Sequence, residues 1–352
     1  MTTMQRIRSA TTRDRVEIAY YAIGRGRGAP LVYLPWGITS HVAHEWEDDE
    51  QRHWLKRLAV KRRVIRFDHR GTGLSDRRAA FTVDGGAHDI DAVVRREGLQ
   101  QFALLGQLHS AASAIRYASQ YPERVSHLIL WCGFANYREF LESSPPLQAA
   151  RAAADKDWHT FTELIAQLAT GWADGSHARR FAKYLRECAT AEHYVRCIDH
   201  FQTVDLTPRL VSLTMPVLVL QPREAAFPTI EVAKRLCAAT PGARLVLLKG
   251  ATLLPFLGDV ETVATNLDQF LTDPELRSPP GGLTEREAEI LERVAGGFSN
   301  QGIARELAIS VRTVERHIGN VYLKIGAHNR AQATAYAIRK GLISGVDTRS
   351  IS

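Results

Sequence analysis

Apolar residues follow two different periods along this chain, and the change between them comes near residue 273. Before that point, short apolar runs alternate with longer amphipathic stretches. The runs are nearly continuous Val, Leu and Ile, which is typical of strands buried on both faces of a parallel sheet. They comprise residues 30–35, 63–68, 102–107, 125–131, 217–221 and 244–249. This alternation predicts a doubly wound α/β domain over residues 1–272, with an antiparallel pair of strands near residues 16–22 at its edge.

A break in the pattern separates this domain from the rest of the chain. Residues 270–282 read FLTDPELRSPPGG, where the Pro-Pro pair cannot continue a helix and the Gly-Gly pair favours flexibility. We therefore expect a linker over residues 273–282. A smaller domain then occupies residues 283–352.

The smaller domain shows helical spacing, and its first helix has recognisable ends. Thr284 is a good N-cap, and Glu287 three residues later completes a capping box. A Gly-Gly pair at residues 296–297 ends the helix, because glycine tolerates a positive φ. The apolar stripe between these ends is formed by Ile290, Leu291 and Val294.

Three further helices are predicted. Ser299 or Asn300 caps the second, which ends at Leu307, and residues 308–310 form a short turn. Ser310 caps the third helix, over residues 311–325, and the fourth covers residues 330–340. The third helix buries Val314, Ile318 and Val321, and the fourth carries Ala331, Ala335 and Ile338 on one side.

Residues 283–330, LTEREAEILERVAGGFSNQGIARELAISVRTVERHIGNVYLKIGAHNR, resemble a complete LuxR-type helix-turn-helix domain. The resemblance implies double-stranded DNA as a partner, with the third helix in the major groove. Arginine pairs with guanine and glutamate accepts from cytosine, so base contacts are expected from Glu315, Arg316 and Asn320. Contacts to the DNA backbone are expected from Asn300, Arg312, Thr313, His317 and Lys324.

The same resemblance implies a homodimer, because the fourth helix commonly dimerises in this family. The alternative for the polar residues of the third helix is that they form only the solvated face of a small helical bundle.

In the larger domain, FDHRGTGLSD, residues 67–76, is similar to the loop after the fourth strand of an α/β-hydrolase. QYPERVSHLILW, residues 120–131, is similar to its helix-to-strand passage beyond the nucleophile. The resemblance covers roughly residues 15–271 and implies a mostly parallel sheet with a helical cap at about residues 136–214. The large apolar side chains of that cap are Phe140, Trp158, Phe161, Leu164, Trp172, Phe181, Tyr184 and Phe201.

Two of the three catalytic positions implied by this resemblance are apolar. A hydrolase nucleophile lies in a G-x-S-x-G elbow between a strand and a helix. The matching segment, LLGQLHSAASAIRYA, puts Leu108 there, and a leucine methyl group cannot attack a carbonyl. The acid position falls at Glu224 in QPREAAFP, and the histidine position falls at Leu253 in KGATLLPFLGD. We therefore expect a hydrolase fold that is not an enzyme.

A rival interpretation takes Ser110 as the nucleophile of a shifted elbow. It needs two residues inserted before the serine and two removed after it. Residues 249–259 contain no histidine, so this serine lacks a general base from that loop.

A cavity is expected between the carboxyl edge of the sheet and the cap. The leucines in the nucleophile and histidine positions make its floor more apolar, which suits a small, largely apolar effector. Backbone N–H groups near Trp36 and His109 are placed to hold a ligand carbonyl. The expected ligand-binding residues are Trp36, Gly37, His41, Leu108, His109, Ser110 and Leu253, with His44 and Glu45 as further polar candidates.

Composition changes this picture little. The formal net charge is +7 and the pI is about 9.3, which suits a nucleic-acid partner without requiring one. No apolar run reaches transmembrane length and no signal peptide opens the chain, so a cytoplasmic protein without a membrane partner is expected. Neither a metal nor a cofactor is expected. The cysteines, which lack metal-ligand or redox-pair spacing and predict reduced thiols, are Cys132, Cys188, Cys197 and Cys237.

Three functions therefore remain open at this point. The first is a transcription regulator whose hydrolase-like domain binds an effector without turning it over and so controls DNA binding. In the second, that domain is only a dimerisation or partner scaffold, which a filled interior would favour. The third is an active hydrolase that uses Ser110.

Overall fold

The computed structural model describes residues 6–172, 175–273, 283, 285–339 and 342. The chain divides into two compact units, residues 1–272 and 273–352. Thr284, the expected helix cap, and residues 274–282 of the expected linker lie outside the described residues.

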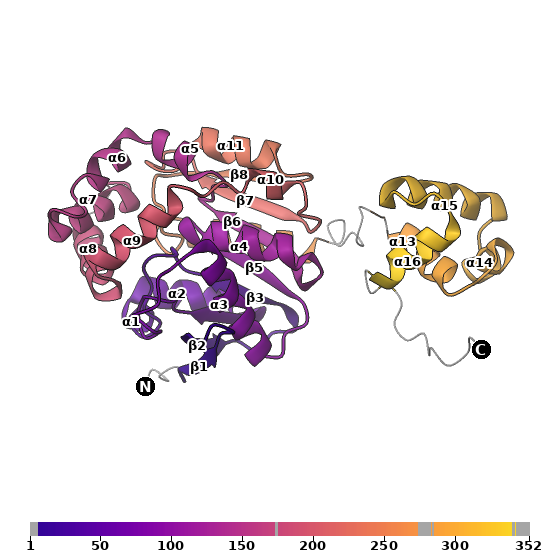
Figure 1. The fold of residues 1–352 in the computed structure, drawn as a ribbon, viewed down its shortest axis with the longest axis horizontal. Coiled ribbons are helices and arrows are strands. Elements are labelled where there is room, and N and C mark those ends of the chain that lie inside the picture. The colour runs from indigo at the N-terminus through magenta and orange to yellow at the C-terminus, as the bar shows by residue number, and fades with distance from the viewer. Residues whose placement is uncertain (1–5, 173–174, 274–282, 284, 340–341, 343–352) are drawn as a thin grey trace. The chain divides into compact units, whose positions relative to one another are not determined.

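The larger unit is built on an eight-stranded, mostly parallel sheet (Figure 1). The strand order is β1-β2-β4-β3-β5-β6-β7-β8. β2 pairs antiparallel with both β1 and β4, and the other pairs are parallel. The strands are β1 (Arg8–Thr11), β2 (Glu17–Ile23), β3 (Gly28–Leu34), β4 (Arg62–Phe67), β5 (Phe102–Gln107), β6 (Val125–Trp131), β7 (Val217–Pro222) and β8 (Arg244–Leu248).

The central strands explain why helices must cover both faces of this sheet. Every residue of β5 and β7 is buried, as the continuous apolar runs predicted. Helices α3 (Val83–Arg96) and α4 (His109–Gln120) pack together, as do α2 (Asp49–Leu58) and α12 (Val260–Thr272). The predicted doubly wound, mostly parallel α/β fold is therefore confirmed. The remaining core helices are α1 (His44–Glu47), the 3-10 helix η1 (Pro122–Arg124) and α11 (Ile230–Ala238).

A run of helices between β6 and β7 forms the cap. Its helices are α5 (Tyr137–Glu142), α6 (Pro145–Arg151), α7 (Trp158–Thr170), α8 (Gly175–Cys188), α9 (Ala191–Phe201) and α10 (Thr207–Leu210). Phe140, Phe161 and Phe201 of the cap are buried, whereas Trp172 is 64% exposed. The cap aromatics are therefore mainly packing residues.

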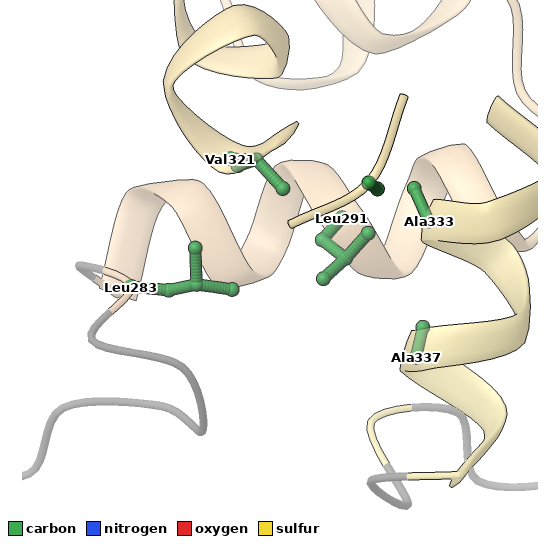
Figure 2. Packing of buried hydrophobic residues seen from close by; sticks show 6 residues of the cluster. Leu283, Leu291, Val321, Ala333 and Ala337 are labelled. Carbon is green, nitrogen blue, oxygen red and sulfur yellow. The ribbon is translucent and has the colours of Figure 1, made fainter. Parts of the chain in front are cut away.

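The smaller unit packs its helices around two apolar clusters. The helices are α13 (Glu285–Ala295), α14 (Asn300–Glu306), α15 (Val311–Ile325) and α16 (Arg330–Arg339). One cluster joins Leu283, which precedes α13, with Leu291, Val321, Ala333 and Ala337 of the helices, and Figure 2 labels all five. The other joins Ile290, Val294, Ile303, Ala304 and Val314. Ala331, Ala335 and Ile338, which the sequence placed on one side of this helix, are exposed, whereas Ala333 and Ala337 are buried.

The helix ends of this unit follow the residues expected to set them. Gly297 has a φ of 84° just after α13. Ser299, rather than Asn300, caps α14 through the backbone N–H of Gly302. Ala308 adopts a φ of 52° in the turn before α15, which reverses the chain without a glycine.

Candidate functional site

The exposed face of α15 carries the residues expected to read DNA. Arg312, Glu315, Arg316 and Asn320 are exposed, and residues three or four apart share one face of a helix. Among the described residues, neither arginine belongs to an ion pair, so both guanidinium groups are available for guanine or phosphate. Thr313 and His317 are half-buried on α15, as is Asn300 at the start of α14.

The start of α15 is fixed by Ser310. Its hydroxyl accepts a hydrogen bond from the Thr313 N–H at 3.1 Å, which satisfies one of the unpaired donors of the first turn. The first turns of the helix, where bases would be contacted, are thereby held in place.

Lys324 differs from the other expected phosphate contacts. Its ammonium group lies 2.6 Å from a carboxylate oxygen of Glu287, whose side chain is only 4% exposed. This ion pair joins α15 to α13, so Lys324 stabilises the unit in addition to any contact it makes with DNA.

In the larger unit, Leu108 occupies the turn between β5 and α4. It is fully buried and has a φ of 50° and a ψ of −118°, a conformation that non-glycine residues rarely adopt. Gly37 lies against this turn with a φ of 98°, and a Cβ there would come within 2.6 Å of the Ser110 nitrogen. A side chain at position 37 would therefore push the two segments apart.

The hydroxyl of Ser110 is engaged with the backbone. Its oxygen lies 2.5 Å from the carbonyl oxygen of Pro35 and 2.9 Å from that of Gln107. It also accepts a hydrogen bond from the Gln107 N–H at 2.9 Å. Ser110 is fully buried and joins the first turn of α4 to the end of β3.

His109 is a buried, neutral imidazole. Its Nδ1 accepts a hydrogen bond from the Trp36 indole at 3.2 Å, so the proton lies on Nε2. Burial lowers its pKa to about 3. Nε2 has no hydrogen-bond partner among the described residues. The surrounding rings of Phe134, Tyr137, Phe140 and Phe201 have centroids 4.9–6.0 Å from that of His109.

The loop after β8, where the resemblance placed a histidine, is tied to the sheet through Leu253. The carbonyl oxygen of Leu253 accepts hydrogen bonds from the side chains of Gln107 (3.1 Å) and Trp131 (2.7 Å). Its N–H donates to Ala169 of the cap at 2.7 Å. Glu224, the candidate acid, is exposed, and its side chain forms no hydrogen bond or ion pair with the described residues.

A small cavity, here named the inner chamber, lies at the carboxyl edge of the sheet. Its volume is about 30 Å³, and its lining comes from β3, β4, β5, α2, α8 and the loops after β3 and β8. A second cavity of about 210 Å³, the vestibule, has a charged rim. The two cavities share Gln51, Phe181, Tyr184, Leu254 and Phe256, so one wall separates them.

The predicted ligand-binding residues lie around the inner chamber, but most of them do not line it. Of the seven predicted ligand-binding residues, Trp36 lines the inner chamber. The other six, Gly37, His41, Leu108, His109, Ser110 and Leu253, are buried beside it and line neither cavity. Leu108 and Leu253 pack into the interior, so the leucines expected to form an apolar pocket floor do not line the inner chamber.

Three polar residues of that wall were missed in the sequence. Tyr33, Arg66 and Gln107 each interrupt an apolar run near the carboxyl end of its strand. A polar residue inside an otherwise apolar strand could have identified them in the sequence, because a buried polar side chain needs hydrogen-bond partners. Tyr33 donates a hydrogen bond to Gln107 at 3.1 Å, and Arg66 pairs with the buried Glu45.

None of the described helices combines the length and the apolar character that a membrane span needs. In the part of the chain that the structure describes, no group of histidine, cysteine or carboxylate side chains has the arrangement of a metal site.

Comparisons with known proteins assign both units. Residues 30–257 match the α/β hydrolase fold family, and residues 282–337 match the luxR family of bacterial regulatory proteins. The response regulator protein VraR of Staphylococcus aureus and of Staphylococcus saprophyticus is 46% identical over 61 residues. Those 61 residues are 17% of this chain and 29% of each relative, so the match spans less than a third of the relatives' length.

Solved structures resemble the larger unit. The esterase RhEst1 from Rhodococcus sp. ECU1013 has a TM-score of 0.66 at 22% identity, covering 76% of this chain and 98% of that one. The enol-lactonase from Burkholderia xenovorans LB400 has a TM-score of 0.62 at 18% identity, covering 76% and 100%. At these identities the likeness shows the fold alone.

The larger match covers more than half of the chain. The chain therefore belongs to the α/β hydrolase fold family and carries a C-terminal helix-turn-helix domain of the luxR family of bacterial regulatory proteins.

Proposed function

We propose that this protein is a ligand-responsive transcription regulator whose hydrolase-like unit binds a small molecule without hydrolysing it. It acts as a homodimer on promoter DNA in the cytoplasm. The observation that carries the proposal is the pair of adjoining cavities at the carboxyl edge of the sheet, beside a turn that holds Leu108. In open α/β sheets, ligands bind at this edge.

The absence of hydrolysis is supported by the surroundings of the elbow. Leu108 offers no nucleophile, and the hydroxyl of Ser110 is held between backbone groups. His109 is neutral and hydrogen-bonded to Trp36, and Leu253 brings no base. A fluorophosphonate probe should therefore leave Ser110 unlabelled, and labelling of Ser110 would contradict this part of the proposal.

Control of DNA binding requires that the ligand prefer one arrangement of the dimer. A ligand shifts an equilibrium only by its difference in affinity for the two states, and coupling of about 1–3 kcal/mol changes affinity by about 5–150-fold. The experiment is a titration of operator DNA with the full chain. If no fragment from the protein's own genomic neighbourhood is bound in any ligand state, the proposal fails.

A second candidate function is favoured by the small volume of the inner chamber. At about 30 Å³ it is far below the 300–1,000 Å³ typical of ligand pockets. The larger unit would then be a scaffold for dimerisation or for a protein partner. Binding of small molecules at the vestibule and chamber separates the two functions, because a scaffold binds none of them there.

A further inference from the structure

The cap contains a larger cavity, here named the cap groove. Its volume is about 490 Å³, which lies within the roughly 300–1,000 Å³ typical of ligand sites. Helices α5, α6 and α9 and the turn after α6 form its lining. None of its lining residues borders the inner chamber or the vestibule, so the cap groove is a separate site.

One positive charge in the cap groove has no partner. Arg151 of α6 is half-buried and lines the groove, and its guanidinium group forms no hydrogen bond or ion pair with the described residues. A partly buried charge loses hydration, and arginine offers a planar set of donors that matches a carboxylate. This position therefore suits the carboxylate of a ligand.

Two tyrosines supply hydroxyl donors in the same part of the cap. Tyr194 of α9 lines the groove and is 7% exposed, Tyr137 of α5 is 2% exposed, and neither hydroxyl forms a hydrogen bond with the described residues. Burial raises the pKa of Tyr137 to about 12 and the pKa of Tyr194 well above its usual value, so both phenols keep their protons. The positive charge of Arg151 opposes both pKa shifts, so it acts on both phenols. Arg151 and Tyr194 thus offer donors from two helices to one acceptor group.

The same lining also carries negative charge. Glu142, Asp155 and Asp199 are exposed, and none of them forms an ion pair with the described residues. Three carboxylates and one guanidinium group repel a ligand that is only an anion, whereas they attract an ammonium group that accompanies its carboxylate. The charges of the cap groove therefore match a zwitterion.

We propose that the cap groove binds an amino acid with an apolar side chain. The ligand carboxylate pairs with Arg151 and accepts a hydrogen bond from the Tyr194 hydroxyl, and the ammonium group faces the three carboxylates. The apolar side chain packs against Leu141, Val195 and Ile198, which are half-buried or buried in the lining. This second ligand site goes beyond the proposed function and does not depend on what the inner chamber binds.

The test uses two amino acids and the analogues that lack one of their charged groups. Phenylalanine is compared with 2-phenylethylamine, which lacks the carboxylate, and with 3-phenylpropanoate, which lacks the ammonium group. Leucine is compared in the same way with 3-methylbutylamine and 4-methylpentanoate. Each compound is titrated calorimetrically into the full chain. We expect each amino acid to bind about tenfold more tightly than either analogue, as one hydrogen bond to a charged group provides.

Two variants separate the two charged contacts. In Arg151→Gln, the preference for each amino acid over its amine should fall to about twofold or less, because the partner of the carboxylate is gone. In Asp155→Asn, the preference over the carboxylate analogue should fall instead. If Arg151→Gln does not fold, Tyr194→Phe keeps the ring, whose centroid lies 4.5 Å from that of Phe161, and should also lower the preference over the amine.

The matched control is Arg138→Gln. Arg138 of α5 is exposed and likewise forms no ion pair with the described residues, but it does not line the cap groove. This variant should keep both tenfold preferences. The inference is overturned if neither amino acid binds, if an amino acid and its amine bind equally, or if Arg151→Gln and Arg138→Gln behave alike. None of these results contradicts the proposed function, because operator binding and the inner chamber are tested separately.

Discussion

Leu108 in the larger unit and Ala308 in the smaller one are both non-glycine residues with a positive φ, 50° and 52°, just before a helix. After Ala308, α15 turns its polar residues toward solvent, where they are free to bind DNA. After Leu108, α4 keeps His109 and Ser110 buried, and both are hydrogen-bonded within the protein. A residue with a positive φ thus precedes a solvent-exposed binding face in one unit and a packed interior in the other.

The two regions therefore depend on different features of the sequence. An exposed helix face needs a cap, a buried stripe and polar residues at helical spacing, all of which are local. A buried chamber needs side chains from several neighbouring strands to meet. The smaller unit can therefore change its DNA specificity by single substitutions, whereas changes beside the chamber must preserve packing.

The largest expected effect comes from removing a core leucine from each unit. Leu108→Ala and Leu291→Ala, both at fully buried positions, should each lower the free energy of unfolding of their own unit by about 2–5 kcal/mol. Leu291→Ala should also weaken DNA binding, because α13 supports α15. Denaturant unfolding and DNA titration measure these effects. Leu323→Ala is the control, since Leu323 is 84% exposed. Loss of DNA binding in Leu108→Ala but not in Leu291→Ala would contradict the claim that packing within the smaller unit supports the DNA-binding helix.

A smaller effect is expected at the DNA-reading face. Arg316→Ala should cost about 1–3 kcal/mol and relax preference at one base pair, whereas Arg312→Ala should weaken all sequences alike and reduce the salt dependence. Selection of random DNA fragments by each variant provides the measurement. An unchanged operator preference in Arg316→Ala would remove this residue from the base-reading set.

The buried imidazole gives the larger unit a dependence on pH. Burial lowers the pKa of His109 from 6.5 to about 3, so between these values the unfolded chain binds a proton that the folded chain does not. Stability from this group is fully present above pH 6.5 and is lost as the pH falls. We expect a loss on the order of 1–2 kcal/mol between pH 6.5 and pH 5 that is missing in His109→Gln. The exposed His328→Gln serves as control, and identical profiles for wild type and His109→Gln would contradict the argument.

The smallest effect concerns the cap of α15. Ser310→Ala should lower the free energy of unfolding of the smaller unit by about 1 kcal/mol, and Ser310→Gly by only a few tenths, because glycine is tolerated at an N-cap. Urea unfolding followed by circular dichroism measures both. Equal losses in the two variants would show that the hydroxyl is not responsible.

The sequence alone was sufficient to predict those strands and helix ends that depend on a local pattern of residues. The strands at residues 102–107 and 125–131 were predicted with their observed ends, because continuous apolar runs identify strands buried on both faces. Ser310 was likewise sufficient to place the start of α15. The elbow turn at Leu108 followed from the resemblance to hydrolases.

The sequence was insufficient where structure depends on which elements become neighbours. The inner chamber brings together Tyr33, Arg66 and Gln107 from β3, β4 and β5, whose adjacency becomes known only from the strand order. In α16, alanines occur on both sides of the helix, so hydrophobicity could not choose between Ala333 and Ala335 for burial.

The central claim is that the hydrolase-like unit controls DNA binding by holding a ligand that it does not hydrolyse. The most direct measurement is the dissociation constant for operator DNA, selected by the full chain itself, with and without a saturating concentration of the small molecule that binds the hydrolase-like unit most tightly. We expect this constant to change by about 5–150-fold and the small molecule to be recovered intact. An unchanged dissociation constant when the hydrolase-like unit is fully occupied would contradict the claim.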